Sequence, residues 1–213
     1  MQKKIILLLI GIIILSVAIL FFIPSIKSPL DYSITKEKIN TCINDENYYS
    51  EDIENMLNHK PVNLSNCDLV GIDLHNIDLQ NANIQNTDLS GADLRGSNLS
   101  GVNLTNSTLY GTDLRDANLK NAILVNAKLD GANLRDTILE SADLNGASIK
   151  HAYVYKTIMV KTNLTNVNAY KTNFCGQDLT HKILSGANLS GADLRYTSLI
   201  FADLSTVDLT GAD

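Results

Sequence analysis

The sequence has no tryptophan and only 6% aromatic residues, which excludes a core built on large rings. The core must instead consist of small and medium-sized aliphatic side chains. The 213-residue chain also lacks an excess of positive charge, because 17 Lys and Arg face 23 Asp and Glu, for a net charge of −6. That balance argues against a protein that binds nucleic acid through a basic surface.

Cysteine and histidine are scarce, and neither is arranged for chemistry. Cys42, Cys67 and Cys175 form no CxxC motif, and an odd number of cysteines fits poorly with a disulfide framework. The four histidines have no recurring serine or carboxylate partner, so the sequence gives no catalytic arrangement. We therefore expect a protein that is not an enzyme and that binds neither metal nor cofactor.

One long stretch lacks charge altogether. Residues 5–23, IILLLIGIIILSVAILFFI, would form a helix about 28 Å long, close to the ~30 Å hydrocarbon thickness of a membrane. The stretch is longer than a usual signal-peptide core, and FFIP at residues 21–24 offers no small-residue cleavage site. We predict an uncleaved single-pass anchor, with secretion after cleavage as the alternative. Lys3 and Lys4 favour a cytoplasmic N-terminus, which would place the rest of the chain outside the cytoplasm.

Residues 24–60 are predicted to be a stalk that ends in short capping helices. In SEDIENMLNHK, residues 50–60, Ser50 can cap a helix whose apolar residues share one face. We expect the 50–59 helix to cover the open end of the domain that follows, through Ile53, Met56 and Leu57.

From Leu64 to Leu209, an apolar residue recurs at every fifth position. This period fits neither an α-helix nor a half-buried strand. A small residue usually stands two positions earlier, with Asp or Asn between the two, so that the unit is A-(D/N)-L-x-x. Two inward positions then alternate with one outward position, and the remaining two residues turn the chain. A short unit of this kind predicts a solenoid of stacked coils.

Stretches such as ANLRDTILESADLNGA, residues 132–147, resemble the pentapeptide-repeat family. The resemblance covers residues 62–213 and implies an all-β fold, a right-handed four-sided β-helix with about twenty residues per coil. We therefore expect a cytoplasmic tail (1–4), a transmembrane anchor (5–23), a stalk with a capping helix (24–60) and the β-helix (61–213).

Residues twenty apart in a four-sided coil stack at about 4.8 Å, so columns can be read from the sequence. Asn63, Asn83 and Asn103 are expected to form an amide ladder. An arginine column is a candidate contact for an anionic polymer or headgroup, although flanking aspartates favour a neutralised, solvated face: Arg95, Arg115 and Arg135. A glycine column marks one corner, where tight turns require a positive φ: Gly71, Gly91, Gly111, Gly131, Gly191 and Gly211.

Residues 147–183 depart from the repeat pattern. Gln177 and Lys182 occupy slots that are predicted to point inward, while several outward slots are apolar. Two interpretations remain open, a tolerated distortion or a surface that contacts a partner. The candidate interaction patch consists of apolar residues predicted to point outward on one side of the solenoid: Ile138, Ile158, Val160, Ile200 and Phe201.

The sequence thus predicts a membrane-anchored, non-enzymatic scaffold or protein-interaction module that binds a protein partner and no nucleic acid. The family implies an alternative, because some members mimic DNA and bind gyrase, which protects it from quinolones. The predicted anchor and a repeat domain with 16 Asp and Glu against 11 Lys and Arg weigh against that role. Because an uncovered last coil exposes unpaired backbone groups, we also expect end-to-end association of copies or a capping element beyond these residues.

Overall fold

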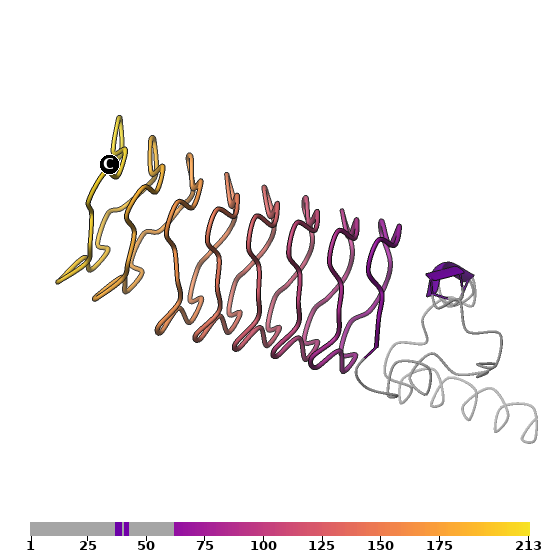
Figure 1. Cartoon of the computed structure of the whole chain (residues 1–213). Helices are drawn as coiled ribbons and strands as arrows, with labels where there is room; N and C mark the ends of the chain where they lie inside the picture. The colour runs from indigo at the N-terminus through magenta and orange to yellow at the C-terminus, as the bar shows by residue number, and fades with distance from the viewer. Residues whose placement is uncertain (1–36, 40, 43–61) are drawn as a thin grey trace, which may run out of the picture. The chain divides into compact units, whose positions relative to one another are not determined.

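The computed structural model describes residues 37–39, 41–42 and 62–213, all of which belong to the second of two compact units, Met1–Ser33 and Ile34–Asp213. Residues 62–213 form a solenoid of stacked coils (Figure 1). Parallel β-bridges of single residues join positions twenty apart, as in Asn63 with Asn83 and Asp68 with Asp88. Four such columns make each coil four-sided, as the sequence predicts.

The five-residue phase continues unbroken, and it places the central residue of each repeat from Leu64 to Leu189 in the core, whereas Leu204 and Leu209 in the last coil are exposed. Leu114 is fully buried, as are Leu64 and Leu69 in the first coil. A turn follows each central residue: the Ile72 amide donates to the Leu69 carbonyl at 3.1 Å, with Gly71 at a φ of +66°. The glycines of the predicted corner all have positive φ, which confirms the turn position.

Asp and Asn at the outward position stabilise the turn that follows them. The Oδ1 atom of Asp68, for example, accepts a hydrogen bond from the backbone N–H of Val70 at 3.1 Å. The predicted ladder at Asn63, Asn83 and Asn103 does not form: their oxygens accept from the amide two residues on, and no hydrogen bond joins the three side chains to one another. The two kinds of bond are compatible, because the Asn98 oxygen accepts from both the Ser100 amide and the Asn118 side chain of the next coil. Asparagine side chains also bond from coil to coil at a corner, from Asn106 to Asn86 and from Asn86 to Asn66.

Buried hydroxyl groups join neighbouring coils. The Oγ1 atoms of Thr112 and Thr137 donate to the carbonyls of Leu89 and Leu114 in the preceding coil, at 2.8 and 2.7 Å. A threonine at the small inward position therefore satisfies its own hydroxyl without disturbing the backbone ladder.

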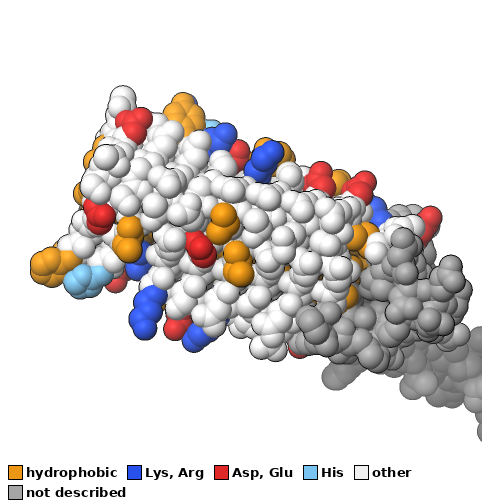
Figure 2. All heavy atoms as spheres, in the orientation of Figure 1, with side chains coloured by type: hydrophobic (Ala, Val, Ile, Leu, Met, Phe, Trp, Pro, Cys, Tyr) orange, Lys and Arg blue, Asp and Glu red, His pale blue; other side chains and the backbone are white. Residues whose placement is uncertain are grey.

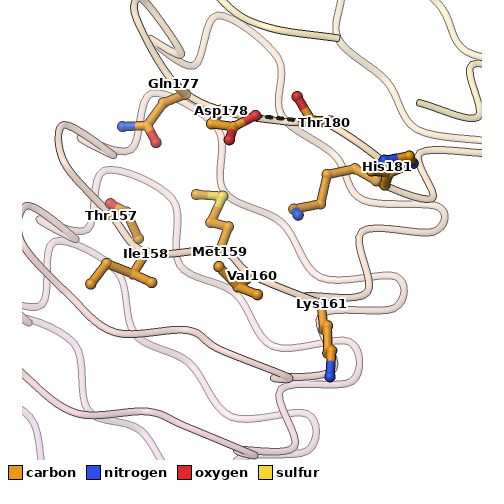
Figure 3. Close-up of a pocket in the computed structure, with 10 residues that line it drawn as sticks. Thr157, Ile158, Met159, Val160, Lys161, Gln177, Asp178, Thr180 and His181 are labelled. Carbon is orange, nitrogen blue, oxygen red and sulfur yellow. Dashed lines mark hydrogen bonds between the residues drawn. The ribbon is translucent and has the colours of Figure 1, made fainter. Parts of the chain in front are cut away.

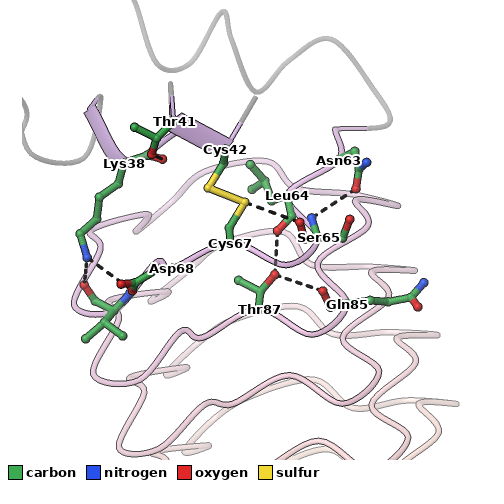
Figure 4. Close-up of a disulfide and its surroundings, with 11 residues drawn as sticks. Lys38, Thr41, Cys42, Asn63, Leu64, Ser65, Cys67, Asp68, Gln85 and Thr87 are labelled. Atoms are coloured by element: carbon green, nitrogen blue, oxygen red, sulfur yellow. Dashed lines mark hydrogen bonds and ion pairs between the residues drawn. A yellow bond between two sulfur atoms is a disulfide. The ribbon is translucent and has the colours of Figure 1, made fainter. Parts of the chain in front are cut away.

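The residues before the solenoid contribute to its first coil (Figure 4). Helical residues 37–39 and 41–42 place Ile39, fully buried, in the core cluster. Cys42 forms a disulfide with Cys67, so the expectation that the cysteines do not form a disulfide framework is wrong. The odd count arises because Cys175, with no disulfide, lies far along the solenoid.

No helix among residues 37–39, 41–42 and 62–213 is long and apolar enough to cross a membrane. The predicted tail (1–4) and anchor (5–23) lie outside the described residues, and so does the capping helix at 50–59 with Ile53, Met56 and Leu57.

Candidate functional site

The charge of the arginine column is largely neutralised by aspartates of the same repeats. Arg95 donates to both carboxylate oxygens of Asp93, through Nε at 2.8 Å and Nη2 at 2.6 Å. Arg115 binds Asp113 in the same way. The guanidinium groups hold the pKa values of both aspartates below the ordinary 3.8. These pairs support the interpretation of a solvated face.

Cations also cover the tyrosine rings nearby. Arg135 and Lys156 lie 5.7 and 5.4 Å from the ring centroid of Tyr155, and Lys171 lies 5.1 Å from that of Tyr170. Contacts of this geometry are favourable cation–π interactions. The two ring faces are therefore already engaged within the chain.

Asp73, His75 and Asp93 form a cluster of potential metal ligands, with their ligand atoms within 4.8 Å of one another. Both carboxylates have other partners, because Asp73 bonds to the His75 ring at 2.7 Å and Asp93 binds Arg95. The cluster is explained by these contacts, without a metal ion.

The predicted apolar patch is on the surface but is divided. Ile158 pairs with the half-buried Ile138 and is 47% exposed, beside an exposed Val160. Ile200 follows Val160 by two coils, and the 79% exposed Phe201 lies next to Ile200 in the sequence. One coil therefore separates the two halves of the patch. Figure 2 shows hydrophobic and basic side chains together on the visible face towards the C-terminal end of the solenoid.

The coil between the two halves of the patch is separated from the coil before it. Among the described residues, each column of bridges is continuous except at one step, where Ile158 and Asp178 form no bridge. In this column the Leu139 amide donates to the Ile158 carbonyl at 2.8 Å, but no such bond joins the Met159 amide to Asp178 one coil later. Within residues 62–213, the amides of Val154 and Leu164, in the two neighbouring columns, also make no bond to the next coil, although the bridges Tyr153–Asn173 and Asn163–Ile183 remain. The two coils are therefore loosened along three sides and unbridged along the middle one.

Long inward side chains explain the opening. Gln177 and Lys182 occupy the small inward slots at the two ends of this side, and each is only 7% exposed. Thr157 and Thr162 hold the same slots one coil earlier and donate to carbonyls of the preceding coil. The Gln177 Nε2 atom donates to the Val154 carbonyl in the same manner. Side chains larger than threonine force the two coils apart, as overpacking does in other cores.

The opening forms a cavity of about 510 Å³ at the centre of the divided patch (Figure 3). One wall comes from the coil with Ile158, Met159 and Val160, and the other from the coil with Asp178 and Lys182. Its full lining is Thr157, Ile158, Met159, Val160, Lys161, Gln177, Asp178, Thr180, His181 and Lys182. The cavity therefore combines an apolar wall with basic side chains.

Lys182 is largely buried as a residue, but its ammonium nitrogen is accessible from the cavity. Within residues 62–213, its ammonium group makes no hydrogen bond and no ion pair. Burial lowers the pKa of Lys182 from its ordinary 10.5, and the Asp178 carboxylate opposes that shift. Asp178 is itself exposed at the rim, where Thr180 donates to it at 2.9 Å and lowers its pKa.

Basic residues also occupy strained corners near the cavity. The turn positions of residues 62–146 have a positive φ and are all Gly, Asn, Asp or Ser. Between residues 147 and 183, two of the seven such positions are Asn166 and Gly176, and the other five hold Lys or His with φ between 53° and 58°: His151, Lys156, Lys161, Lys171 and His181. Lysine adopts a left-handed backbone less readily than Gly, Asn, Asp or His, so Lys156, Lys161 and Lys171 each carry a conformational cost.

Sequence reasoning placed the patch residues and the inward Gln177 and Lys182, but it missed the cavity. The repeat phase is unchanged at residues 157–182, so nothing in the period marks a missing bridge. The available signal was side-chain length and polarity: Gln177 and Lys182 are long polar residues in slots that elsewhere hold Ala, Ser, Thr, Cys, Val or Ile.

Comparisons with known proteins agree with this architecture. A solved trypsin-treated variant of QnrB1, described as a plasmid-mediated fluoroquinolone resistance protein, is 21% identical with a TM-score of 0.52, covering 68% of this chain and 88% of that chain. A second QnrB1 variant is 22% identical over the same shares, with a TM-score of 0.50. At these identities the likeness shows the fold alone.

HetL from the cyanobacterium Nostoc sp. strain PCC 7120 is a pentapeptide-repeat protein involved in heterocyst differentiation regulation. It is 23% identical, with a TM-score of 0.41, over 73% of this chain and 90% of its own. The comparison with curated proteins gave no match.

The sequence profile for pentapeptide repeats matches eight copies in this chain, at residues 62–96, 97–136, 122–159 and 178–211. The matches leave out residues 160–177, which include Val160, Lys161 and Gln177 of the cavity lining. They nevertheless cover more than half of the chain. With the unbroken five-residue phase and the four columns of bridges, they show that the chain belongs to the pentapeptide-repeat family.

Proposed function

We propose that this protein is a non-enzymatic, membrane-anchored interaction module whose solenoid binds an acidic protein outside the cytoplasm. One observation carries the proposal: residues 147–183 contain five lysines and one aspartate, a net charge of +4, within a chain of net charge −6. The same segment exposes Ile158 and Val160 beside the cavity. Apolar groups ringed by charge of one sign are typical of a docking surface for a partner of opposite charge.

The proposed location has support at the other end of the solenoid. A disulfide such as Cys42–Cys67 persists in oxidising compartments and is rare in the cytosol. This agrees with an anchor at residues 5–23 that holds the N-terminus in the cytoplasm and the solenoid outside. Protease accessibility in intact cells tests the location, since a cytoplasmic solenoid would stay protected until the membrane is broken.

An acidic protein is favoured over an anionic membrane surface because of how the lysines are distributed. Lys156, Lys161 and Lys171 stand at three different corners of the four-sided coil, since successive repeats form successive sides. A flat surface contacts one side of such a coil, whereas a protein partner can extend around a corner. A gyrase-binding role through DNA mimicry gains no support, because the mimic must be acidic where this segment is basic.

Photocrosslinking from a defined position tests the docking function. A photoreactive residue at Val160, in full-length protein expressed in its native cells, should give one adduct with an acidic protein. The matched control carries the same probe at Lys120, two coils earlier in the same column, and should give no adduct. Charge reversal by Lys156→Glu and Lys161→Glu should abolish the adduct. Equal adducts from both positions, or an adduct indifferent to charge reversal, would contradict the proposal.

A further inference from the structure

We propose that the cavity between the coils of Met159 and Lys182 binds a carboxylate group that carries a short aliphatic chain. The inference rests on the proposed docking function, because it names the group that the acidic partner would insert. It is drawn from the shape, lining and charge of the cavity, which the repeat pattern alone does not explain.

Lys182 supplies the positive charge for this site. Its residue is 7% exposed, lines the cavity, and has no hydrogen-bond or ion-pair partner among residues 62–213. The ammonium nitrogen is accessible from the cavity but partly desolvated, which is unfavourable, and an anion that enters the cavity would offset that cost. Threonine, which holds this slot one coil earlier, would avoid the cost entirely.

The open junction adds hydrogen-bond donors. In the coil before it, the amides of Leu139 and Ser141 donate to Ile158 and Val160 at 2.8 Å each. The corresponding amides of Met159 and Lys161 make no such bond within the described solenoid. Backbone N–H groups beside a lysine are suitable donors to a carboxylate. The carbonyls freed on the facing coil lie at the open side, where water can satisfy them.

The rest of the lining limits the ligand to a monoanion with an apolar part. Ile158, Met159 and Val160 form an aliphatic wall that suits a short hydrocarbon chain. Asp178 at the rim disfavours a second negative charge on the ligand. No arginine lines the cavity, whereas phosphate recognition commonly uses its paired donors. A volume of about 510 Å³ is in the range of small-ligand sites.

The carboxylate can come from a free aliphatic acid or from a peptide, and two probes separate these sources. Hexanoate represents the free acid, and Gly-Ser-Gly-Ser-Leu-Leu with a free C-terminus represents the peptide. Hexanamide and the amidated peptide are their uncharged counterparts.

Methionine methyl signals provide a local readout, because the chain has only three methionines and Met159 lines the cavity. In full-length protein labelled with carbon-13 at the methionine methyl groups, in detergent micelles, a carboxylate probe should shift the Met159 signal saturably. The uncharged counterparts should bind at least about tenfold more weakly. The signal is assigned from its loss in Met159→Leu.

Three variants test the role of Lys182. Lys182→Met keeps the length of the side chain and removes its charge, and Lys182→Thr restores the usual residue of the slot. Both should weaken binding at least about tenfold, while Lys171→Thr, at an exposed corner, should leave it unchanged.

Shifts from hexanoate alone identify a free acid, and shifts from the peptide alone identify a peptide terminus. No saturable shift from either probe, or equal binding by Lys182→Met, overturns the proposal.

The two proposals can fail separately. If neither probe binds but the Val160 adduct persists and still depends on Lys156 and Lys161, the docking surface stands and the carboxylate site is wrong. If a probe binds in a Lys182-dependent way but no adduct forms, the site stands and the docking function is wrong.

Discussion

The regular coils (residues 62–146) and the lysine-rich segment (residues 147–183) have the same period, yet they differ in surface charge and in the residues at their corners. The regular coils have 11 acidic and 5 basic residues and place Gly, Asn, Asp or Ser at every left-handed corner. The lysine-rich segment reverses the charge, fills most of these corners with Lys or His, and contains the open junction. Stability alone would favour Gly, Asn, Asp or Ser at the corners and a continuous ladder of bridges throughout the solenoid.

The core tolerates the change because its volume is redistributed. Phe174 is fully buried where leucine is usual, and Val154 and Ala169 nearby are smaller than leucine. Exchanges that conserve volume cost little in a packed core. The two regions therefore differ in their corners, their outward residues and their small inward slots, which are the positions that a partner can contact or that control the spacing of coils.

The largest expected effect is a charge placed in the regular core. Leu114→Asp puts a carboxylate without a partner into an apolar stack and should lower the free energy of unfolding by at least about 4 kcal/mol. Ile123→Asp is the matched control, since Ile123 is 41% exposed at an outward position that often holds Asp. Chemical denaturation measures both. A Leu114→Asp protein as stable as Ile123→Asp would refute the assignment of the core.

Loss of the disulfide should have the next largest effect, confined to the regular coils. Cys42→Ser with Cys67→Ala removes a cross-link over a sequence separation of 25 residues, which should cost about 3 kcal/mol. Faster amide exchange should appear in the first coils and not in the lysine-rich segment. Cys175→Ser, which affects no disulfide, should change neither quantity.

Corner substitutions should stabilise one region and destabilise the other. Lys156→Asn and Lys171→Asn replace residues in a left-handed conformation with one that adopts it more readily, and each should gain about 0.5–1 kcal/mol. Asn121→Lys, the reverse change in the regular coils, should lose a similar amount. Thermal unfolding shows whether each variant is more or less stable than the native protein. If all three variants change stability in the same direction, the contrast between the regions is wrong.

The smallest expected effect is a pH dependence caused by Lys182. Its pKa is lowered in the folded protein, so between that value and the ordinary 10.5 the unfolded chain binds more protons. The free energy of unfolding should therefore gain a contribution that rises with pH across this window. The difference between the native protein and Lys182→Met isolates that contribution. A constant difference from neutral pH to pH 10.5 would contradict the burial of a charged Lys182.

The repeat period determined nearly all of the fold in advance, because each buried Leu and each small residue recurs in a fixed phase. The expected amide ladder at Asn63 does not form, and the turn bond from the Ser65 amide to the Asn63 oxygen was not foreseen, because the period shows which residues stack and not which donors their side chains meet. The Cys42–Cys67 pair joins residues from outside and inside the repeats, and no period relates them. The cavity depends on how far Gln177 and Lys182 push two coils apart, which is a matter of packing and not of sequence pattern.

Amide hydrogen exchange tests the open junction, and with it the central contrast, most directly. In the full-length protein, the Met159 and Lys161 amides should exchange at least about 100-fold faster than those of Leu139 and Ser141, which hold the same places one coil earlier and are bonded from coil to coil. Lys182→Thr combined with Gln177→Thr should restore protection by allowing the coils to close. Equal protection of both pairs in the native protein would show that the ladder is continuous and would contradict the account.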